Sequence, residues 1–476
     1  MSYADIYDIK NPSFLERNPR LMEKYGHLID GIKHPSGDAH ETELEQNKLA
    51  VLIDNTVKEG CRRYGVDYAT FDLNKVTEAT TAASGQTAVG GSGTIGGVTN
   101  PVGIGGTGAD PYGKGRAFII KNTVAMITQM FPNMIAREIV SVQPIPQPSY
   151  KIFYMDILRS NAYTNAGDYE GNDVEVIAAG QKTNEGIVGA GNYADSYEYV
   201  GYDASTGKED PDIRELRMEL SNVDVFTKEK KLKVNVTMEV QQDLMAYHGM
   251  NAMSIMGGEL SKEIAREWDT NIIAGMYKAA LSNSDALKSR LASAQAGSPV
   301  TVSRTPIIKT FDMDYRGNQL SDYTASWADR EAYLNTFYEV FEDVATEIYK
   351  KRYVRPNFIV IPVKLGALFR KMHAFDTEMT MESGNITTGR YLAGTFKNVC
   401  KVYIDVHAKD VLVGYNGTSW MDSGFVFSPY ELAYMTPVVL NPNTFRQTQA
   451  MMSRAAMECI APDCYGVIKL IEEPLS

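Results

Sequence analysis

Residues 131–155 read FPNMIAREIVSVQPIPQPSYKIFYM, and this stretch decides how the rest of the chain is interpreted. Its first part predicts a short helix, because apolar residues recur there at helical spacing. The prolines that follow forbid a longer helix, and the aromatic run after them predicts a strand. The apolar residues are Ile135, Ile139 and Val140, the prolines are Pro144, Pro146 and Pro148, and the strand residues are Ile152, Phe153 and Tyr154. The stretch carries no pattern of chemical residues, so we interpret it as a structural junction.

Length, net charge and composition exclude some classes of protein. A chain of 476 residues exceeds the size at which one core usually stops growing, so we expect two or three packing units. The formal net charge of −12 disfavours a general nucleic-acid-binding protein, because neutralising phosphates needs a basic face. The 28 Tyr and 22 Met residues suit broad contact surfaces, with Tyr-rich loops as the alternative. One basic cluster is interpreted as a solvated strand edge: Lys228, Lys230, Lys231 and Lys233.

Cysteine usage and the first residues indicate where the chain folds. Four scattered cysteines are too few for a secreted disulfide scaffold, so a reducing environment is predicted. They are Cys61, Cys400, Cys459 and Cys464. The start MSYADIYDIK lacks a basic segment leading to an apolar one, and no stretch approaches the ~18 apolar residues of a membrane span. We therefore expect neither a signal peptide nor a membrane span.

Composition divides the N-terminal half into segments. Residues 1–78 are polar and predicted to form a partly helical arm. Residues 79–115 are Gly, Ser, Thr and Ala with few large side chains, which predicts a flexible tether. Residues 160–211 are rich in Tyr, Asn, Gly and Asp and are interpreted as a long projecting loop, with a disordered insertion as the alternative. Regularly spaced tyrosines favour a loop that orders on assembly: Tyr193, Tyr197, Tyr199 and Tyr202.

Periodicity predicts the elements of the second half. The strongest helix has Asn251 at its N-cap and an apolar residue at every fourth position, and Gly249 is predicted to end the shorter helix before it. Gly257 and Gly258 are expected to mark a bend or a close contact. The helical stripe, interpreted as core, is Leu260, Ile264, Trp268, Ile272 and Met276, and a second one is Phe337, Phe341, Val344 and Ile348. Strands are predicted at 358–362, 401–406, 411–415 and 424–430, with a helix at 364–373 and a turn at Asn416-Gly417.

The glycine-rich segment contains two patterns that imitate nucleotide-binding motifs. Gly103, Gly105 and Gly108 form an apparent GxGxxG, but a dinucleotide loop must follow a strand and open a helix, and glycines surround this one on both sides. Gly113 and Lys114 stand at phosphate-loop spacing, yet Gly115 replaces the hydroxyl that would bind magnesium. We therefore predict no nucleotide site.

Metal and nucleophile patterns are also missing from the sequence. The six histidines form no HExxH motif, and Cys459 and Cys464 have no companion pair at zinc spacing. No GxSxG nucleophile elbow occurs. The histidines are His27, His34, His40, His248, His373 and His407. We predict no catalytic, cofactor-binding or metal-binding residue, and hence no enzyme.

Four stretches in a shared order resemble one family. The order of FPN, a charged helical turn, SVQP and an aromatic strand in residues 131–155 is similar to the opening of the major capsid protein of T-even-like tailed bacteriophages of the myovirus type. Residues 230–269 and 388–417 resemble its later segments, and 441–462 resembles its closing block except at Ser453-Arg454-Ala455-Ala456. The matching residues of the second stretch are Gln242, Asp243, Leu244, His248, Gly249 and Glu263.

The resemblance implies an α+β fold of the Hong Kong 97-like capsid type. Its parts are expected to be an N-terminal arm, an extended loop, a peripheral domain with a long spine helix, and an axial domain. The corresponding ranges are 1–78 for the arm, 79–115 for the tether, 116–159 for the first part of the peripheral domain, 160–235 for the extended loop, 236–325 for the peripheral domain with the spine helix, 326–432 for the axial domain, and 433–476 for the closing strands.

The resemblance also implies a structural function. The chain would self-assemble into hexamers and pentamers of an icosahedral or prolate shell, enclosing double-stranded DNA without sequence-specific binding. Scaffold, portal, vertex, decoration and maturation protease proteins would accompany it, in the host bacterial cytoplasm during assembly and then in the virion. Family members lose an N-terminal segment after an acidic residue, a setting that Leu21-Met22-Glu23 satisfies. They also carry an inserted domain, for which residues 160–211 are too short and too polar.

Three alternatives stay open at this point. An encapsulin-like cellular shell protein has the same fold and would enclose cargo instead of a genome. A nucleotide-binding enzyme would use the glycine-rich region and would bind ATP or NAD. An adhesin or sheath-like fibre protein would form open filaments instead of closed shells.

Overall fold

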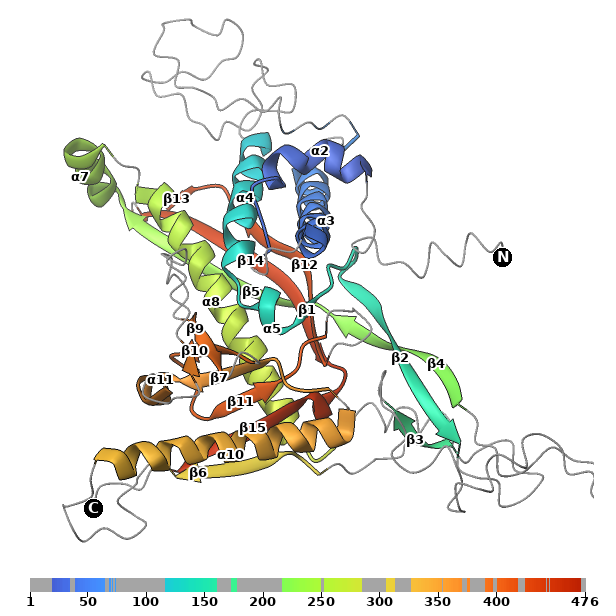
Figure 1. Ribbon diagram of the computed structural model, residues 1–476. Helices are drawn as coiled ribbons and strands as arrows, with labels where there is room; N and C mark the ends of the chain where they lie inside the picture. The colour runs from blue at the N-terminus through green and yellow to red at the C-terminus, as the bar shows by residue number, and fades with distance from the viewer. Residues whose placement is uncertain are drawn as a thin grey trace, which may run out of the picture.

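The computed structural model describes about three fifths of the chain as two sheets, a projecting ribbon and the helices packed on them (Figure 1). The described residues are 19–34, 39–64, 68–69, 71, 73, 116–160, 173–177, 216–249, 252–284, 305–312, 327–352, 354–369, 375–376, 390–396, 400–417, 424–441, 443–444 and 446–471. The predicted tether, both glycine motifs, Asn251, His373 and the tyrosines between 193 and 202 lie outside these residues.

A five-stranded sheet forms the centre of the molecule. Its order is β1 (Ser141–Val142), β12 (Phe425–Met435), β14 (Arg446–Cys459) and β13 (Val439–Asn441), and β5 (Lys228–Thr237) pairs with β14 as well. The pairs of β14 with β12, β13 and β5 are antiparallel. Residues 453–456, which depart from the family pattern, lie within β14. Residues 453–455 pair with β5 without a register shift, whereas the pairing with β12 shifts register at Glu431.

Helix α8 (Ala252–Leu281) covers one face of this sheet, as its apolar stripe predicts. Trp268 is fully buried against Phe427 of β12, with ring centroids 5.8 Å apart, and its indole donates a hydrogen bond to Ser453 Oγ at 2.8 Å. Gly257 lies at a close contact, because a Cβ there would be 3.0 Å from Cε of Met435, whereas Gly258 has open space around it. The predicted close contact is therefore confirmed at Gly257 and not at Gly258.

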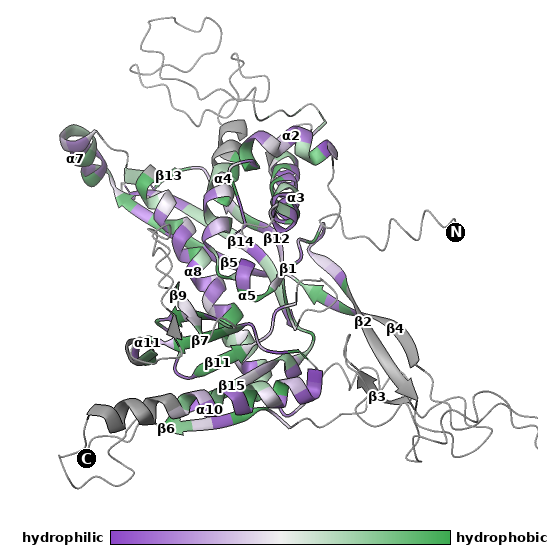
Figure 2. Cartoon of the chain, in the orientation of Figure 1, coloured by the Kyte–Doolittle hydropathy of each residue, from purple (hydrophilic) through white to green (hydrophobic). Residues whose placement is uncertain are grey.

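The N-terminal helices pack against β12, and α4 also contacts α8. Helix α3 (Ala39–Tyr64) packs against α2 (Pro19–Ile29) and α4 (Arg116–Met130). At Gly60 a Cβ would be 2.8 Å from Cγ1 of Ile120, so α3 and α4 approach closely there. Hydrophobic and hydrophilic residues alternate along α3 and α8 (Figure 2), as expected of helices with one buried face. The described part of the predicted arm is thus helical and packs on the core.

The junction contains the predicted short elements. The 3-10 helix η2 (Phe131–Asn133) and the four-residue helix α5 (Ala136–Ile139) lead into β1, and the aromatic strand β2 (Ser149–Ser160) follows. Strand β2 pairs with β4 (Leu216–Phe226) along eleven antiparallel positions, and β3 (Asp173–Ile177) pairs on its other side. Strands β2 and β4 form a ribbon that projects from the body of the molecule (Figure 1).

Strand β4 continues through Thr227 into β5 and then into α7 (Met238–His248). Gly249 ends α7 with a φ of 65°, which confirms the predicted helix end, since glycine adopts this left-handed conformation without strain. The strand pattern at Leu232, Val234 and Val236 is likewise confirmed by β5.

A seven-stranded sheet forms the second layer. Its order is β6 (Ile308–Asp312), β15 (Tyr465–Ile471), β11 (Val411–Gly414), β7 (Phe358–Pro362), β10 (Cys400–Asp405), β9 (Arg390–Phe396) and β8 (Phe375–Asp376). Every residue of β7 is buried, as its uninterrupted apolar run predicts. Helices α10 (Trp327–Arg352) and α11 (Val363–Phe369) pack on this sheet. Phe337 of α10 meets the rings of Phe311, Phe369 and Phe396.

The C-terminal strands are divided between the two sheets in an order that the sequence did not indicate. Strand β12 lies in the five-stranded sheet, and β15 lies in the seven-stranded sheet. Strand β11 pairs with β7 and β15 and not with the strand that follows it, so the chain at Asn416-Gly417 leaves the seven-stranded sheet. The domain boundaries at 326–432 and 433–476 stay predictions. No helix within the described ranges is long and apolar enough to cross a membrane.

Candidate functional site

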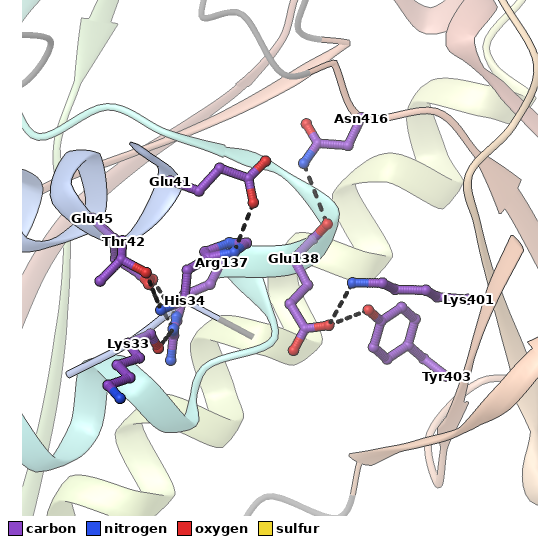
Figure 3. A network of polar contacts seen from close by, with 10 residues as sticks. All are labelled: Lys33, His34, Glu41, Thr42, Glu45, Arg137, Glu138, Lys401, Tyr403 and Asn416. Atoms are coloured by element: carbon purple, nitrogen blue, oxygen red, sulfur yellow. Dashed lines mark hydrogen bonds and ion pairs between the residues drawn. The ribbon is translucent and has the colours of Figure 1, made fainter. Parts of the chain in front are cut away.

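A polar network centred on helix α5 joins distant parts of the chain (Figure 3). The adjacent residues Arg137 and Glu138 point in different directions, because successive side chains on a helix are about 100° apart. Arg137 faces the turn between α2 and α3, and Glu138 faces the seven-stranded sheet. Four residues of backbone therefore connect the N-terminal helices to a sheet formed by much later parts of the chain.

Arg137 is held by Glu45 of α3. Its Nε and Nη2 each donate to a different carboxylate oxygen, the second at 2.6 Å, and both side chains are more than nine-tenths buried. Nη1 donates to the carbonyl oxygen of Pro132 at 2.8 Å, and Nη2 also donates to that of Lys33 at 3.1 Å. This paired, bidentate geometry compensates both charges for their burial.

The same turn is fixed by His34, whose Nδ1 lies 3.0 Å from a carboxylate oxygen of Glu41. The backbone N–H of His34 donates to Thr42 Oγ1 at 3.2 Å. His34 is thus held to α3 by contacts of its own, in addition to the contact of Arg137 with Lys33.

Glu138 makes the opposite connection. Its carboxylate accepts a hydrogen bond from the Tyr403 hydroxyl of β10 and lies 3.9 Å from Nζ of Lys401. Its carbonyl oxygen accepts from Asn416 Nδ2 at 3.3 Å. Burial, and then the Glu138 charge, raise the pKa of Tyr403 well above its ordinary value, so this hydroxyl stays a donor.

A second connection joins α3 directly to β12. Arg63 donates from Nη1 and Nη2 to the two carboxylate oxygens of Glu431 at 2.9 and 2.8 Å, and its guanidinium lies 4.0 Å from the centroid of the Tyr434 ring. Glu431 is completely buried, and this burial raises its pKa although Arg63 opposes the rise. Nearby, the Tyr430 hydroxyl donates to Glu59 at 2.6 Å.

A third group closes α2 onto α3. Tyr25 and Tyr68 both donate to Oδ1 of Asp54, and Lys58 lies 2.7 Å from Oδ2. Burial is the largest cause of the raised pKa of both tyrosines, and the Asp54 carboxylate adds to it. All three connections satisfy their own charged groups within the fold, so they can hold elements together but offer no reactive group to a substrate.

The described residues contain no cluster of three or more His, Cys, Asp and Glu side chains suited to a metal ion. All four cysteines are free. A pocket of about 350 Å³ beside α10 is lined by Ala345, Thr346, Tyr349 and Arg355, a set without a nucleophile or an acid–base pair. The histidines are dispersed, with His27 in α2, His40 in α3, His248 at the end of α7 and His407 after β10.

The sequence interpretation missed the residues of these connections. Glu431 carries the clearest signal, because a lone carboxylate in the apolar strand FVFSPYELAYM must have a partner when buried. Arg137 and Glu138 carry a similar signal in the apolar junction. Their partners are 92 and 265 residues away, so the sequence alone does not reveal them.

Comparison with known proteins identifies the family. Residues 117–466 match the family model of the major capsid protein Gp23. The chain belongs to this family. The match confirms the resemblance to T-even-like major capsid proteins. The mixed helices and strands of the structure confirm the predicted α+β class.

Individual relatives are distant. The chain is 25% identical to the major capsid protein of Enterobacteria phage T4 over 269 residues, which cover 53% of this chain and 46% of that protein. It is 22% identical to the major capsid protein of Serratia phage KSP90 over 336 residues, covering 64% of this chain and 69% of the relative. The chain spans about half the length of the T4 and T6 proteins it matches.

Phage capsids are among the solved structures with low similarity to the chain. The asymmetric unit of the bacteriophage PhiM1 mature capsid has a TM-score of 0.39 at 11% identity and covers 72% of this chain and 88% of that chain. The capsid structure of the Cyanophage P-SCSP1u has a TM-score of 0.37 at 13% identity and covers 71% of this chain and 89% of the other. The family assignment rests on the sequence match.

Proposed function

We propose that the chain is the major capsid subunit of a tailed bacteriophage head. It would self-assemble into hexamers and pentamers of an icosahedral or prolate shell around double-stranded DNA. The observation that carries this proposal is the match to the Gp23 capsid family across residues 117–466. The projecting β2–β4 ribbon supports it, because an element outside the body of one subunit is available to a neighbouring one (Figure 1).

The proposed function depends on contacts between subunits and requires no catalytic residue. Many moderate contacts cooperate in a ring of subunits, because each contact raises the effective concentration of the next. The buried ion pairs of Arg137 and Arg63 would help in such a ring, because they keep the N-terminal helices attached to the rest of the subunit when neighbouring subunits bind.

Negative-stain electron microscopy of the purified chain tests the proposal. The chain would be expressed alone and together with the neighbouring reading frames, from which scaffold, portal, vertex and decoration proteins are expected. Hexamers, sheets or closed polyhedral shells are the expected result. Open filaments, or a monodisperse monomer or dimer in both samples, would contradict it. Nuclease-protected DNA in shells formed in the host cytoplasm would separate a phage capsid from an encapsulin-like compartment.

Proteolytic maturation after Glu23 is the finer part of the proposal. Leu21, Met22 and Glu23 lie in α2, and Tyr25, two residues further on, is tied to Asp54. A protease must unwind α2 to cut there, so processing should be slower than in an unstructured arm. N-terminal sequencing of mature particles should show Lys24 as the first residue, and an intact Met1 would reject the cleavage.

A further inference from the structure

The dipeptide Asn416-Gly417 lies where the chain leaves the seven-stranded sheet, and it combines a set of polar contacts with a specific chemical reactivity. It is the single Asn-Gly pair in the 476 residues. An asparagine followed by glycine cyclises readily, because glycine has no side chain to hinder its backbone nitrogen as that nitrogen approaches Cγ of the asparagine. The reaction ends in the loss of the amide nitrogen. The sequence therefore places a labile asparagine at this position.

Three hydrogen bonds hold Asn416 in the structure. Its backbone N–H donates to Oδ1 of Asn357 at 3.0 Å, and its carbonyl oxygen accepts from Nδ2 of the same residue at 2.7 Å. Its side-chain Nδ2 donates to the carbonyl oxygen of Glu138 at 3.3 Å, and Figure 3 shows the side chain directed at α5. Asn357 is itself fixed, since its N–H donates to the carbonyl oxygen of Gly414 and its own carbonyl oxygen accepts from the N–H of Lys401, at 3.0 Å each. The main chain and the amide of Asn416 are thus both restrained.

These bonds oppose the geometry that cyclisation needs. The backbone nitrogen of Gly417 reaches Cγ of Asn416 only if the peptide group between the two residues rotates and the side chain turns toward it. The carbonyl oxygen of that peptide group is bound to Asn357, and the side-chain amide is bound to Glu138. Rotation must therefore break these contacts first. Asn416 and Gly417 are only partly buried, so water reaches them once the contacts open.

We propose that Asn416 is a deamidation site that becomes reactive only when the connection between α5 and the seven-stranded sheet opens. The backbone nitrogen of Gly417 attacks Cγ of Asn416 and loses its proton, the bond from Cγ to Nδ2 breaks, and ammonia leaves. Water then opens the resulting succinimide ring and leaves aspartate or isoaspartate at position 416. No group is oxidised or reduced. The inference goes beyond the proposed function, because it concerns a reaction of the single subunit and not its assembly.

The product of this reaction cannot re-form the connection. A carboxylate at position 416 has no hydrogen to donate to the carbonyl oxygen of Glu138, so two acceptors would face each other. Isoaspartate also adds a carbon atom to the main chain and displaces the groups that Asn357 binds. A subunit in which the connection has opened and Asn416 has reacted is therefore altered permanently.

Peptide mapping by mass spectrometry measures the reaction at Asn416. Folded chain and chain unfolded in urea would be incubated at mildly alkaline pH, which favours removal of the amide proton of Gly417. The exposed Asn283, which is followed by Ser284, is the internal reference for the conditions. The rate at Asn416 relative to that at Asn283 should be about tenfold lower in the folded chain than in urea, because the reaction requires local opening. Equal relative rates in the two samples would overturn the inference.

Removing the partner residue tests whether these contacts give the protection. Asn357→Ala deletes both main-chain contacts of Asn416, so the rate at Asn416 in the folded chain should rise about tenfold while that at Asn283 stays unchanged. The matched control is Asn133→Ala, which removes an exposed asparagine hydrogen bond to Gln129 and should leave both rates unchanged. Circular dichroism shows which variants are folded. If Asn357→Ala does not fold, Asn357→Asp, which keeps the acceptor and loses the donor, should give a smaller rise. An unchanged rate in a folded variant of Asn357 would reject the proposed protection.

Asn416→Asp tests the consequence of the reaction. It replaces the donor to Glu138 by a carboxylate, so hydrogen exchange in residues 136–142 should become about tenfold faster. Asn283→Asp makes the same chemical change at an exposed site and should leave this exchange unchanged. Exchange in 136–142 that is as slow in Asn416→Asp as in the unaltered chain would overturn the proposed loss of the connection.

Discussion

The two sheets are stabilised in different ways. The seven-stranded sheet and α10 enclose an apolar interior in which Phe337, Phe341, Phe369 and Phe396 contact one another at several angles. The five-stranded sheet has an apolar core too, but its N-terminal helices are attached by buried ion pairs such as Arg63–Glu431. Apolar packing stabilises a fold in proportion to the area buried, and a cavity in it lowers the stability. A buried ion pair contributes little net stability, but removing only one of its two partners lowers the stability strongly. The seven-stranded sheet is thus a rigid unit, whereas the N-terminal helices are attached to the five-stranded sheet by specific pairs of side chains.

Phe337→Ala should have the largest effect, because it empties the centre of the aromatic cluster. We expect a loss of about 4 kcal/mol in the free energy of unfolding, the usual size for a fully buried Phe. Urea unfolding followed by circular dichroism measures it. Tyr349→Ala, on the same helix and half exposed, is the control and should cost less than about 1 kcal/mol. Equal losses would mean that α10 is not packed as described.

Arg63→Ala should come next, with a loss of about 3 kcal/mol, since it leaves the fully buried Glu431 without its partner. The double variant Arg63→Met/Glu431→Leu should recover most of the loss, because apolar residues of similar volume can replace a buried pair. Arg62→Ala removes a neighbouring arginine whose side chain is 80% exposed and should be nearly neutral. If the double variant is as unstable as the single one, the contrast between the two sheets fails.

Arg137→Lys should have an intermediate effect, about 1–2 kcal/mol, because a lysine keeps the charge but loses the bidentate contact with Glu45. The loss of stability should be confined to the helices that Arg137 contacts. Hydrogen exchange should rise in α2 and in the first turns of α3, while β7 and β10 stay protected. Equal deprotection of the seven-stranded sheet would show that α5 transmits the change further than its attachment to α3.

The pH dependence of Glu431 should be the smallest effect. Burial raises its pKa above the ordinary glutamate value of 4.5, so the folded state holds the proton after the unfolded chain has lost it. The free energy of unfolding should therefore fall as pH rises above 4.5, relative to that of Glu431→Gln. Urea unfolding of both proteins between pH 4 and 7 measures the difference. Arg63, Glu59 and Arg454 face this group, and a rise in relative stability with pH would show that their charges outweigh burial.

Helices and strands could be predicted from local sequence patterns. The features that the sequence did not predict depend on contacts between residues far apart in the chain. The stripe from Leu260 to Met276, the helix end at Gly249 and the buried run of β7 were all predicted because each depends on a few neighbouring residues. The distribution of β12 and β15 between two sheets was not, because pairing partners far apart in the chain leave no periodic signal. The basic cluster shows both cases. Strand alternation separates Lys230 from Lys231, but only the structure brings Arg446 and Arg454 beside them.

The position of β14 and β15 has a consequence for the order in which the chain can fold during synthesis. β14 separates β12 from β5 in one sheet, and β15 separates β6 from β11 in the other. Residues 446–471 are therefore needed in both layers, and only the short 3-10 helix η3 (Pro462–Cys464) separates the two strands. A nascent subunit cannot complete either sheet until this last described segment has been made. The finished surfaces of the subunit then arise together, which keeps incomplete chains from joining a growing assembly.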